Sequence, residues 1–241
     1  MPLHVERRDR VAILTLDDPD RRNALSPELV DEIVAAVAAC EADDGVGAIV
    51  VTGAPPAFCS GADISALRSM RGRDASDVRS IYDGFLCVRA STVPTVAAVN
   101  GPAVGAGFNL ALCCDVRIAG ASARFDARFA RLGLHPGGGH LWMLEREVGP
   151  QAAAAIGLFG ERIDAARAEA LGLVWRTVPD EELLEAALEL AGAGAALPRD
   201  LAATVKATLR ETPWRADFEE AVQAELARQR RTFEQGGGAP R

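Results

Sequence analysis

The stretch PTVAAVNGPAVGAGFNLALCCD, residues 94–115, decides how the rest of the chain is organised. Its apolar residues 95–99 predict a buried strand, and Asn-Gly-Pro at 100–102 predicts a turn that ends it. A glycine-rich loop around Ala106 then leads into an apolar helical run. Such a loop presents backbone N–H groups at the positive end of a helix, where a carbonyl oxygen that gains negative charge can be held. The alternative is a glycine loop that only permits close packing.

A second loop of the same kind is FCSGADI, residues 58–64, which follows the apolar strand predicted for 48–52 and precedes a helical pattern. Loops that follow parallel strands emerge at the same edge of a sheet. The N–H groups near Ala62 and Ala106 can therefore converge on one oxygen, as in an oxyanion hole. The pattern around Ser60 lacks the glycine of a nucleophile elbow, and the chain contains no phosphate-binding glycine motif.

Composition narrows the possible classes of protein. The chain has 241 residues and a net charge of −8, which argues against nucleic acid as a partner. Its five cysteines form no C-x-x-C pair, which favours reduced thiols in a cytoplasmic protein over disulfides or a metal site. We expect neither a signal peptide nor a membrane span, because the N-terminus is charged and no apolar run approaches ~20 residues.

The order of elements predicts an α/β fold with a helical C-terminal part. Ser26 and Pro27 favour a helix start, as N-cap and first helical residue. We expect a core over residues 1–180, a helical region over 181–235 and a flexible tail over 236–241. The remaining expected strands are 11–16, 116–119, 124–125 and 174–178. The expected helices include 66–92, 141–148, 150–158 and 164–171. The first of these helices contains a polar patch at 70–77 that is expected to be exposed.

Four motifs together resemble the enoyl-CoA hydratase/isomerase (crotonase) family: RRNAL at 21–25, FCSGADI at 58–64, the central stretch, and RLGLHPGGG at 131–139. The resemblance runs from about residue 5 to residue 233. It implies a spiral of repeated ββα units whose C-terminal helices assemble trimers, which often pair into hexamers. It also implies that an acyl-CoA thioester is held with its carbonyl between the N–H groups of Ala62 and Ala106.

The same resemblance implies which residues lie along coenzyme A. Arg21 and Arg22 can reach its phosphates or can belong to a solvated turn, and Asp63 is expected to cap the following helix. No cofactor is expected beyond the coenzyme A part of the substrate, and no metal. The residues placed along coenzyme A are Arg22, Ala24, Leu25, Ser60, Gly61, Ala62, Asp63 and Ile64.

The sequence departs from the family at the positions of the two glutamates that hold and activate water in hydratases. These positions are Asn109 and Phe129, and neither side chain can act as a base. Gly137 stands where other branches place an acid or a tyrosine. The candidate substitutes are Asp126, His135 and His140, of which His135 is preferred for its place in the later loop, although it can equally cap loop backbone groups. The chain also ends in GGGAPR, where the family usually has one more helix and a basic, aromatic terminus.

We therefore expect a cytoplasmic enzyme of fatty-acid metabolism that acts on acyl-CoA, nominally an enoyl-CoA hydratase, with its activity limited by the missing glutamates. A non-catalytic acyl-CoA binder or scaffold subunit is the alternative, and hydrolysis or lyase chemistry by His135 is a third interpretation. We expect a homotrimer or hexamer. The sequence argument for assembly is the set of leucines beyond residue 181, namely Leu183, Leu184, Leu188, Leu190 and Leu197.

Overall fold

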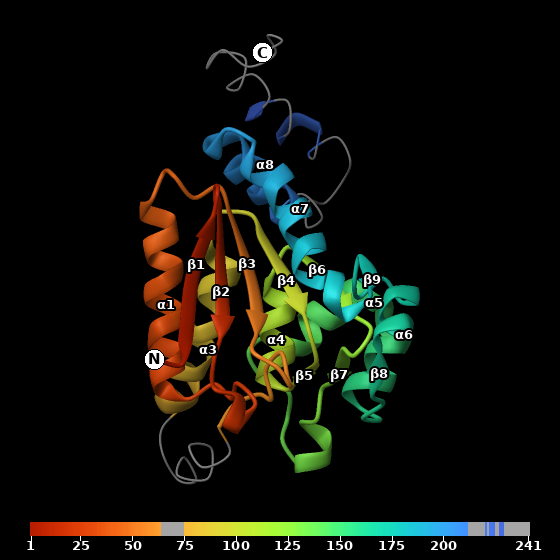
Figure 1. Cartoon of the computed structure of the whole chain (residues 1–241). Coiled ribbons are helices and arrows are strands. Elements are labelled where there is room, and N and C mark those ends of the chain that lie inside the picture. The colour runs from red at the N-terminus through yellow and green to blue at the C-terminus, as the bar shows by residue number, and fades with distance from the viewer. Residues whose placement is uncertain (64–74, 212–219, 221, 225–226, 229–241) are drawn as a thin grey trace.

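A computed structural model describes residues 1–63, 75–211, 220, 222–224 and 227–228 of the chain (Figure 1). The predictions for Ile64, for residues 66–74 of the helix expected at 66–92, for the exposure of the polar patch at 70–77, and for most of the chain beyond residue 211, with the tail at 236–241, lie outside these residues. None of the helices in the described ranges has the length and apolar character needed to cross a membrane.

Two sheets form the framework of the fold, and their strands are those seen in Figure 1. The larger has the order β1-β2-β3-β4-β6-β9, with β1 antiparallel to β2 and all other neighbours parallel. The smaller has the order β5-β7-β8. The strands are β1 Leu3–Arg8, β2 Val11–Leu16, β3 Ala48–Gly53, β4 Thr95–Val99, β5 Pro102–Val104, β6 Val116–Gly120, β7 Arg124–Asp126, β8 Ile163–Asp164 and β9 Arg176–Val178.

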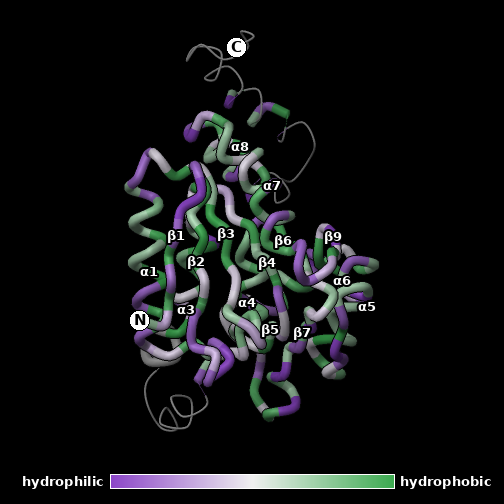
Figure 2. The backbone as a smooth tube through the Cα atoms, viewed as in Figure 1, coloured by the Kyte–Doolittle hydropathy of each residue, from purple (hydrophilic) through white to green (hydrophobic). Residues whose placement is uncertain are grey.

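Helices cover both faces of the larger sheet. The helices α1 Pro27–Ala42, α3 Ala75–Ala90 and α4 Ala106–Cys113 contribute to one apolar cluster, and α7 Leu183–Ala195 packs on strands β2, β3, β4 and β6. The tube in Figure 2 is mostly hydrophobic along the central strands and hydrophilic in many of the connecting turns. The other helices are α5 His140–Gly157, α6 Ala165–Ala170 and α8 Arg199–Glu211, with short 3₁₀ turns η1 Pro19–Arg21, η2 Ala130–Leu132 and η3 Asp180–Glu182.

Most of the predicted elements are confirmed. Helix α1 begins as expected, with Pro27 in its first turn and the Ser26 hydroxyl accepting a hydrogen bond from Leu29 N at 3.3 Å. The two helices expected at 141–148 and 150–158 form α5, which is kinked where Gly149 has a φ of 76°. Strand β5 was not expected: the chain resumes an extended conformation directly after the predicted turn, and it pairs with β7.

Strand β1 was also missed, because only Leu3 of its six residues is buried. A strand at the edge of a sheet needs no apolar alternation on its solvent side, so its sequence carries little signal. Its pairing with β2, from Leu3 opposite Leu16 to Arg8 opposite Val11, exists only in the folded chain.

The leucines that suggested an assembly surface have another role. Leu183 is 3% exposed and belongs to the apolar cluster between α7 and the larger sheet. Leu184, Leu188 and Leu190 are partly buried and pack against this cluster. Of the five, Leu197 is counted among the exposed hydrophobic residues, at 42%. These side chains contribute to the chain's own core, and the expected homotrimer or hexamer stays a prediction.

Candidate functional site

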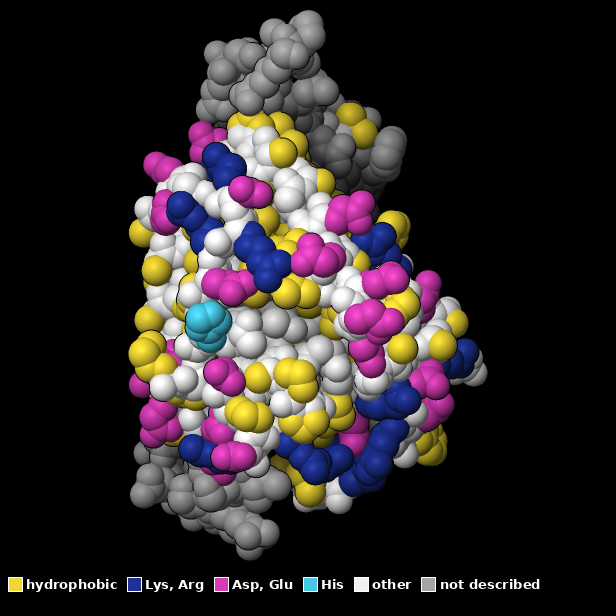
Figure 3. Space-filling model, in the orientation of Figure 1, with side chains coloured by type: hydrophobic (Ala, Val, Ile, Leu, Met, Phe, Trp, Pro, Cys, Tyr) yellow, Lys and Arg dark blue, Asp and Glu magenta, His cyan; other side chains and the backbone are white. Residues whose placement is uncertain are grey.

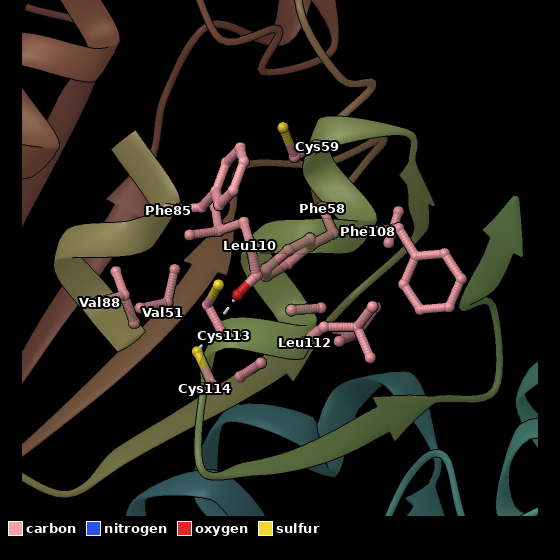
Figure 4. Close-up of a cluster of buried hydrophobic side chains, with 14 of the residues drawn as sticks. Val51, Phe58, Cys59, Phe85, Val88, Phe108, Leu110, Leu112, Cys113 and Cys114 are labelled. Carbon is pink, nitrogen blue, oxygen red and sulfur yellow. Dashed lines mark hydrogen bonds between the residues drawn. The ribbon is translucent and has the colours of Figure 1, made fainter. Parts of the chain in front are cut away.

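The two predicted loops meet beside the N-terminus of α4. Cys59 forms an isolated parallel bridge with Ala103, in which Cys59 N donates to the Pro102 carbonyl at 3.1 Å and Val104 N donates to the Cys59 carbonyl at 2.9 Å. Figure 4 shows Phe58 and Cys59 close to Phe108 and Leu110 of α4 within the buried cluster. The contact between loops that the sequence only suggested is thus made by backbone hydrogen bonds.

Glycine is required at two places where these loops touch. A β-carbon built on Gly107 would lie 2.2 Å from the Cys59 carbonyl oxygen, so any side chain there would push the loops apart. Gly61 has a φ of 101°, and a β-carbon on it would lie 2.7 Å from the Val104 carbonyl oxygen and 3.6 Å from Ala106 N. The Gly61–Ala62 segment therefore passes next to the first amide of α4.

The N–H groups of Ala62 and Ala106 are left available by this arrangement. Leu25 N donates to the Gly61 carbonyl at 2.8 Å and Asp63 N donates to the Leu25 carbonyl at 3.3 Å, so the amide of Ala62 lies outside this bridge. Within the part of the chain that the structure describes, neither Ala62 N nor Ala106 N has a hydrogen-bond acceptor. Ala106 is the first residue of α4, where the helix dipole adds positive potential. Two donors and this potential suit an oxygen that becomes negatively charged.

Asn109 lies one turn beyond Ala106 and is 1% exposed. Its amide nitrogen donates to the Gly137 carbonyl at 3.0 Å, and its amide oxygen lies 2.7 Å from His140 Nδ1. A carbonyl oxygen only accepts hydrogen bonds, so the amide nitrogen must face Gly137 and the amide oxygen must face the histidine. Nδ1 of His140 therefore carries the proton, and Nε2 is left with a lone pair.

His140 is a neutral imidazole in this environment. It is 1% exposed, its ring lies 5.3 Å from the Phe108 ring and 5.2 Å from the Phe129 ring, and burial lowers its pKa from 6.5 to about 4. Its Nε2 atom is buried and has no hydrogen-bond partner among the described residues. The sequence put His140 among three candidates without preferring it, and only the fold brings it to Asn109, 31 residues earlier.

Asp126 and His135, the other two candidates to replace the family's glutamates, make different contacts from those of His140. Asp126 is 4% exposed and forms ion pairs with Arg128 at 2.9 Å, with Arg162 at 3.2 Å and with Arg131. Figure 3 shows basic side chains gathered over the region of β7 and β8, where this cluster belongs. His135 is exposed, and its Nδ1 lies 2.7 Å from the Pro136 carbonyl oxygen, an arrangement that matches the loop-capping alternative.

The residues expected along coenzyme A lie together at one edge of the site. The Ser60 hydroxyl donates to the Arg21 carbonyl at 3.0 Å, Ser60 N donates to the Arg22 carbonyl at 3.0 Å, and Arg21 pairs with Asp63 at 3.4 Å. Ala24 and Leu25 are buried behind them. The capping role expected of Asp63 falls on a helix start outside the described residues.

Sequence reasoning overlooked Asn23, which is fully buried and holds its own turn against the segment 54–58 that leads into the first loop of the site. Its amide nitrogen donates to the carbonyls of Ala54 and Ala57 at 2.9 and 2.8 Å, and its amide oxygen accepts from Asp18 N at 2.9 Å. The available signal was an asparagine inside the motif RRNAL, next to a polar turn.

Comparisons with known proteins agree over nearly the whole chain. The sequence model of the family described as enoyl-CoA hydratase/isomerase matches residues 6–237. A protein named probable enoyl-CoA hydratase EchA14, from Mycobacterium tuberculosis, is 52% identical over 221 residues, which cover 90% of this chain and 84% of that protein. The crystal structure of an enoyl-CoA hydratase from Polaromonas sp. JS666 superposes with a TM-score of 0.91 at 30% identity, covering 98% of this chain and 93% of the other. A monofunctional enoyl CoA isomerase from M. smegmatis gives 0.79 at 34% identity, covering 92% and 98%.

Proposed function

Because the chain belongs to the enoyl-CoA hydratase/isomerase family, with the crotonase-like fold, we propose that it is an enzyme that holds an acyl-CoA thioester by its carbonyl oxygen. The N–H groups of Ala62 and Ala106 are the two donors of the oxyanion hole. They stabilise the enolate that forms when the carbon next to the carbonyl loses a proton, or when water adds to the third carbon of a 2-enoyl thioester. The enolate is consumed when the carbon next to the carbonyl takes up a proton. One such donor contributes roughly 3–4 kcal/mol to the transition state.

The convergence of the two loops is the observation that supports this proposal. Gly61 and Gly107 permit the approach of the loops, backbone hydrogen bonds between Cys59 and the β5 segment hold it, and α4 begins at Ala106. A preorganised pair of donors costs no reorganisation when charge develops on the substrate, which is why such sites are effective.

The nominal reaction is hydration of a 2-enoyl thioester in fatty-acid metabolism, and the residues at hand make it slow. Asn109 is held by Gly137 and His140 and has no proton to exchange in the useful range. Phe129 packs on the His140 ring and offers no polar atom. Among the described residues, the site keeps the two N–H donors and has no carboxylate at the two positions where hydratases of the family have glutamates.

A non-catalytic acyl-CoA binder is the second candidate, and the same absence of a carboxylate at Asn109 and Phe129 favours it. Turnover across a panel of enoyl, hydroxyacyl and saturated acyl thioesters separates the two functions. A cytoplasmic location also belongs to this proposal and is supported by the cysteines: all five are free, and burial raises the pKa of the Cys59 and Cys113 thiols to about 12.

Thermal unfolding with an acyl-CoA panel tests the binding step. A ligand at about 100 times its dissociation constant adds ~2.7 kcal/mol, which raises the melting temperature of a domain this size by roughly 5–10 °C. Ala106→Pro removes the N–H at a first helical position, where proline is otherwise tolerated, and we expect it to abolish the response. Ala106→Gly keeps the donor and is the matched control.

A backbone ester at Ala106, introduced with lactic acid in place of alanine, removes the same N–H without a proline ring. The ester variant therefore tests the N–H group even if the proline ring of Ala106→Pro disturbs the loop. A folded ester variant that responds to acyl-CoA as strongly as the unmodified protein would refute the oxyanion assignment.

A further inference from the structure

Tyr82 is the one tyrosine in the sequence and lies on α3, half-buried against the main apolar cluster. Its ring lies 5.6 Å from the Phe85 ring. Nothing in the sequence patterns or in the site described above assigns it a role. Its position relative to the glycine loop before α5 suggests one.

The Tyr82 hydroxyl fills the space that a side chain at position 137 would need. A β-carbon built on Gly137 would lie 2.1 Å from the hydroxyl oxygen and 3.1 Å from Cζ. The φ angle of Gly137 is not in the left-handed region, so the phenol, not the backbone, demands glycine there. A polar group therefore stands at this point of the loop even though residue 137 carries none.

This point is linked to the start of α4 through Asn109. The Gly137 carbonyl accepts the hydrogen bond from Asn109, and Asn109 follows Ala106 by three residues on α4. Three residues advance a helix by about 4.5 Å. The hydroxyl thus lies against a loop residue that is hydrogen-bonded to the side chain one turn beyond Ala106, and we take it to face the acyl chain of a thioester held at Ala106.

Among the residues that the structure describes, the Tyr82 hydroxyl has no hydrogen-bond partner. No residue within the described ranges donates a hydrogen bond to it or accepts one from it, and it is not among the unpartnered polar atoms that are sealed from solvent. A phenol can both donate and accept. Among the described residues, the Phe85 ring lies 5.6 Å from the Tyr82 ring, and Tyr82 packs against the main apolar cluster. An unbranched apolar acyl chain would strip water from the hydroxyl and leave it without a partner.

We propose that the Tyr82 hydroxyl binds an oxygen on the third carbon of the acyl chain, so that the protein selects 3-hydroxyacyl thioesters over unsubstituted acyl thioesters. This rests on the proposed function, since it needs the thioester carbonyl at Ala62 and Ala106. A 3-hydroxyacyl thioester is what addition of water to a 2-enoyl thioester yields, so the selected ligand belongs to the reaction class proposed above. A hydrogen bond to an otherwise unpaired group changes affinity by roughly ten-fold.

Calorimetric titration with 3-hydroxybutyryl-CoA and butyryl-CoA tests the proposal, because the two ligands differ by one oxygen. The unmodified protein is expected to prefer the hydroxyl ligand by about ten-fold, and Tyr82→Phe to lose that preference while its affinity for butyryl-CoA stays within about two-fold. Gly192→Ala, at a glycine with open space around it, is the control and keeps the preference. Equal affinities in the unmodified protein, or a preference that survives Tyr82→Phe, would overturn the proposal. If neither thioester binds, the proposed function itself fails.

A spectroscopic measurement tests the same contact in the unmodified protein, without the Tyr82→Phe variant. Protein labelled with ¹³C at the tyrosine Cζ gives one signal, that of Tyr82. We expect 3-hydroxybutyryl-CoA to shift this signal more than butyryl-CoA does at saturation. A signal that does not move when 3-hydroxybutyryl-CoA is bound contradicts contact with the hydroxyl.

Discussion

His140 makes the stability of this protein sensitive to mild acid. The imidazole is neutral and buried between Phe108 and Phe129, and its pKa is lowered from 6.5 to about 4 by burial. In the unfolded chain it regains its ordinary pKa. Between these two values the unfolded state binds more protons than the folded state, so the free energy of unfolding rises with pH and falls on acidification.

The size of the effect follows from the two pKa values. A shift of one pKa unit is worth about 1.36 kcal/mol, so the full difference amounts to roughly 3 kcal/mol once the unfolded histidine is protonated and the folded one is still neutral. Between about pH 7.5 and about pH 5 the contribution lost is about 2 kcal/mol. This stability is fully present above the unfolded pKa and is lost as the pH falls toward the folded pKa.

Urea unfolding at the two pH values, followed by circular dichroism, measures this loss. His140→Gln keeps a donor for the Asn109 amide oxygen and cannot titrate, so we expect its free energy of unfolding to fall by about 2 kcal/mol less than that of the unmodified protein. Carboxylates also titrate in this pH range, and comparing the two proteins cancels their contribution. One of them is Glu41: burial raises its pKa, but hydrogen bonds from Ser91 and Thr92 outweigh burial, so the pKa is lowered overall. His135→Gln, at an exposed histidine, is the matched control and should follow the unmodified protein.

Equal pH dependence in the unmodified protein and His140→Gln would refute this reasoning. It would mean that the imidazole is protonated, or open to water, in the folded state. Proton NMR gives an independent reading, because a His140 ring signal that titrates near its ordinary pKa would contradict a neutral, buried imidazole with its proton on Nδ1.

The remaining predictions concern chemistry and assembly. Hydration of a short 2-enoyl-CoA should be slower than in a homologue with both glutamates by about 10²–10⁴-fold, the usual contribution of general acid–base catalysis, and family-like rates in a kinetic assay would contradict this. Asn109→Glu with Phe129→Glu should raise the rate but lower the stability, because the new carboxylate replaces a donor to the Gly137 carbonyl. We also expect a homotrimer or hexamer by light scattering at micromolar concentration, supported by exposed apolar side chains on α8 such as Leu209, which is 70% exposed; a monomer would contradict it.

The parts of the fold that the sequence predicts well are those with a local physical signal. Strands β2, β3 and β4 are short, nearly continuous apolar runs between turns, as expected for strands buried on both faces. Helix α1 carries its own start in Ser26 and Pro27. The glycines at 61 and 107 mark the two loops of the site, because no other residue permits so close an approach.

Other features depend on contacts between distant parts of the chain and leave no such local signal. Strand β1 exists through its pairing with β2, and the leucines of α7 pack against strands that come much earlier in the chain. Among the histidines, the sequence favoured His135 for its place in the loop, whereas the fold seats His140 against Asn109 and leaves His135 at the surface. No sequence motif marks Tyr82, which reaches the glycine loop only because α3 packs beside Gly137. Backbone conformation is encoded within a few neighbouring residues, but the partner of a buried polar side chain is chosen only when the elements pack together.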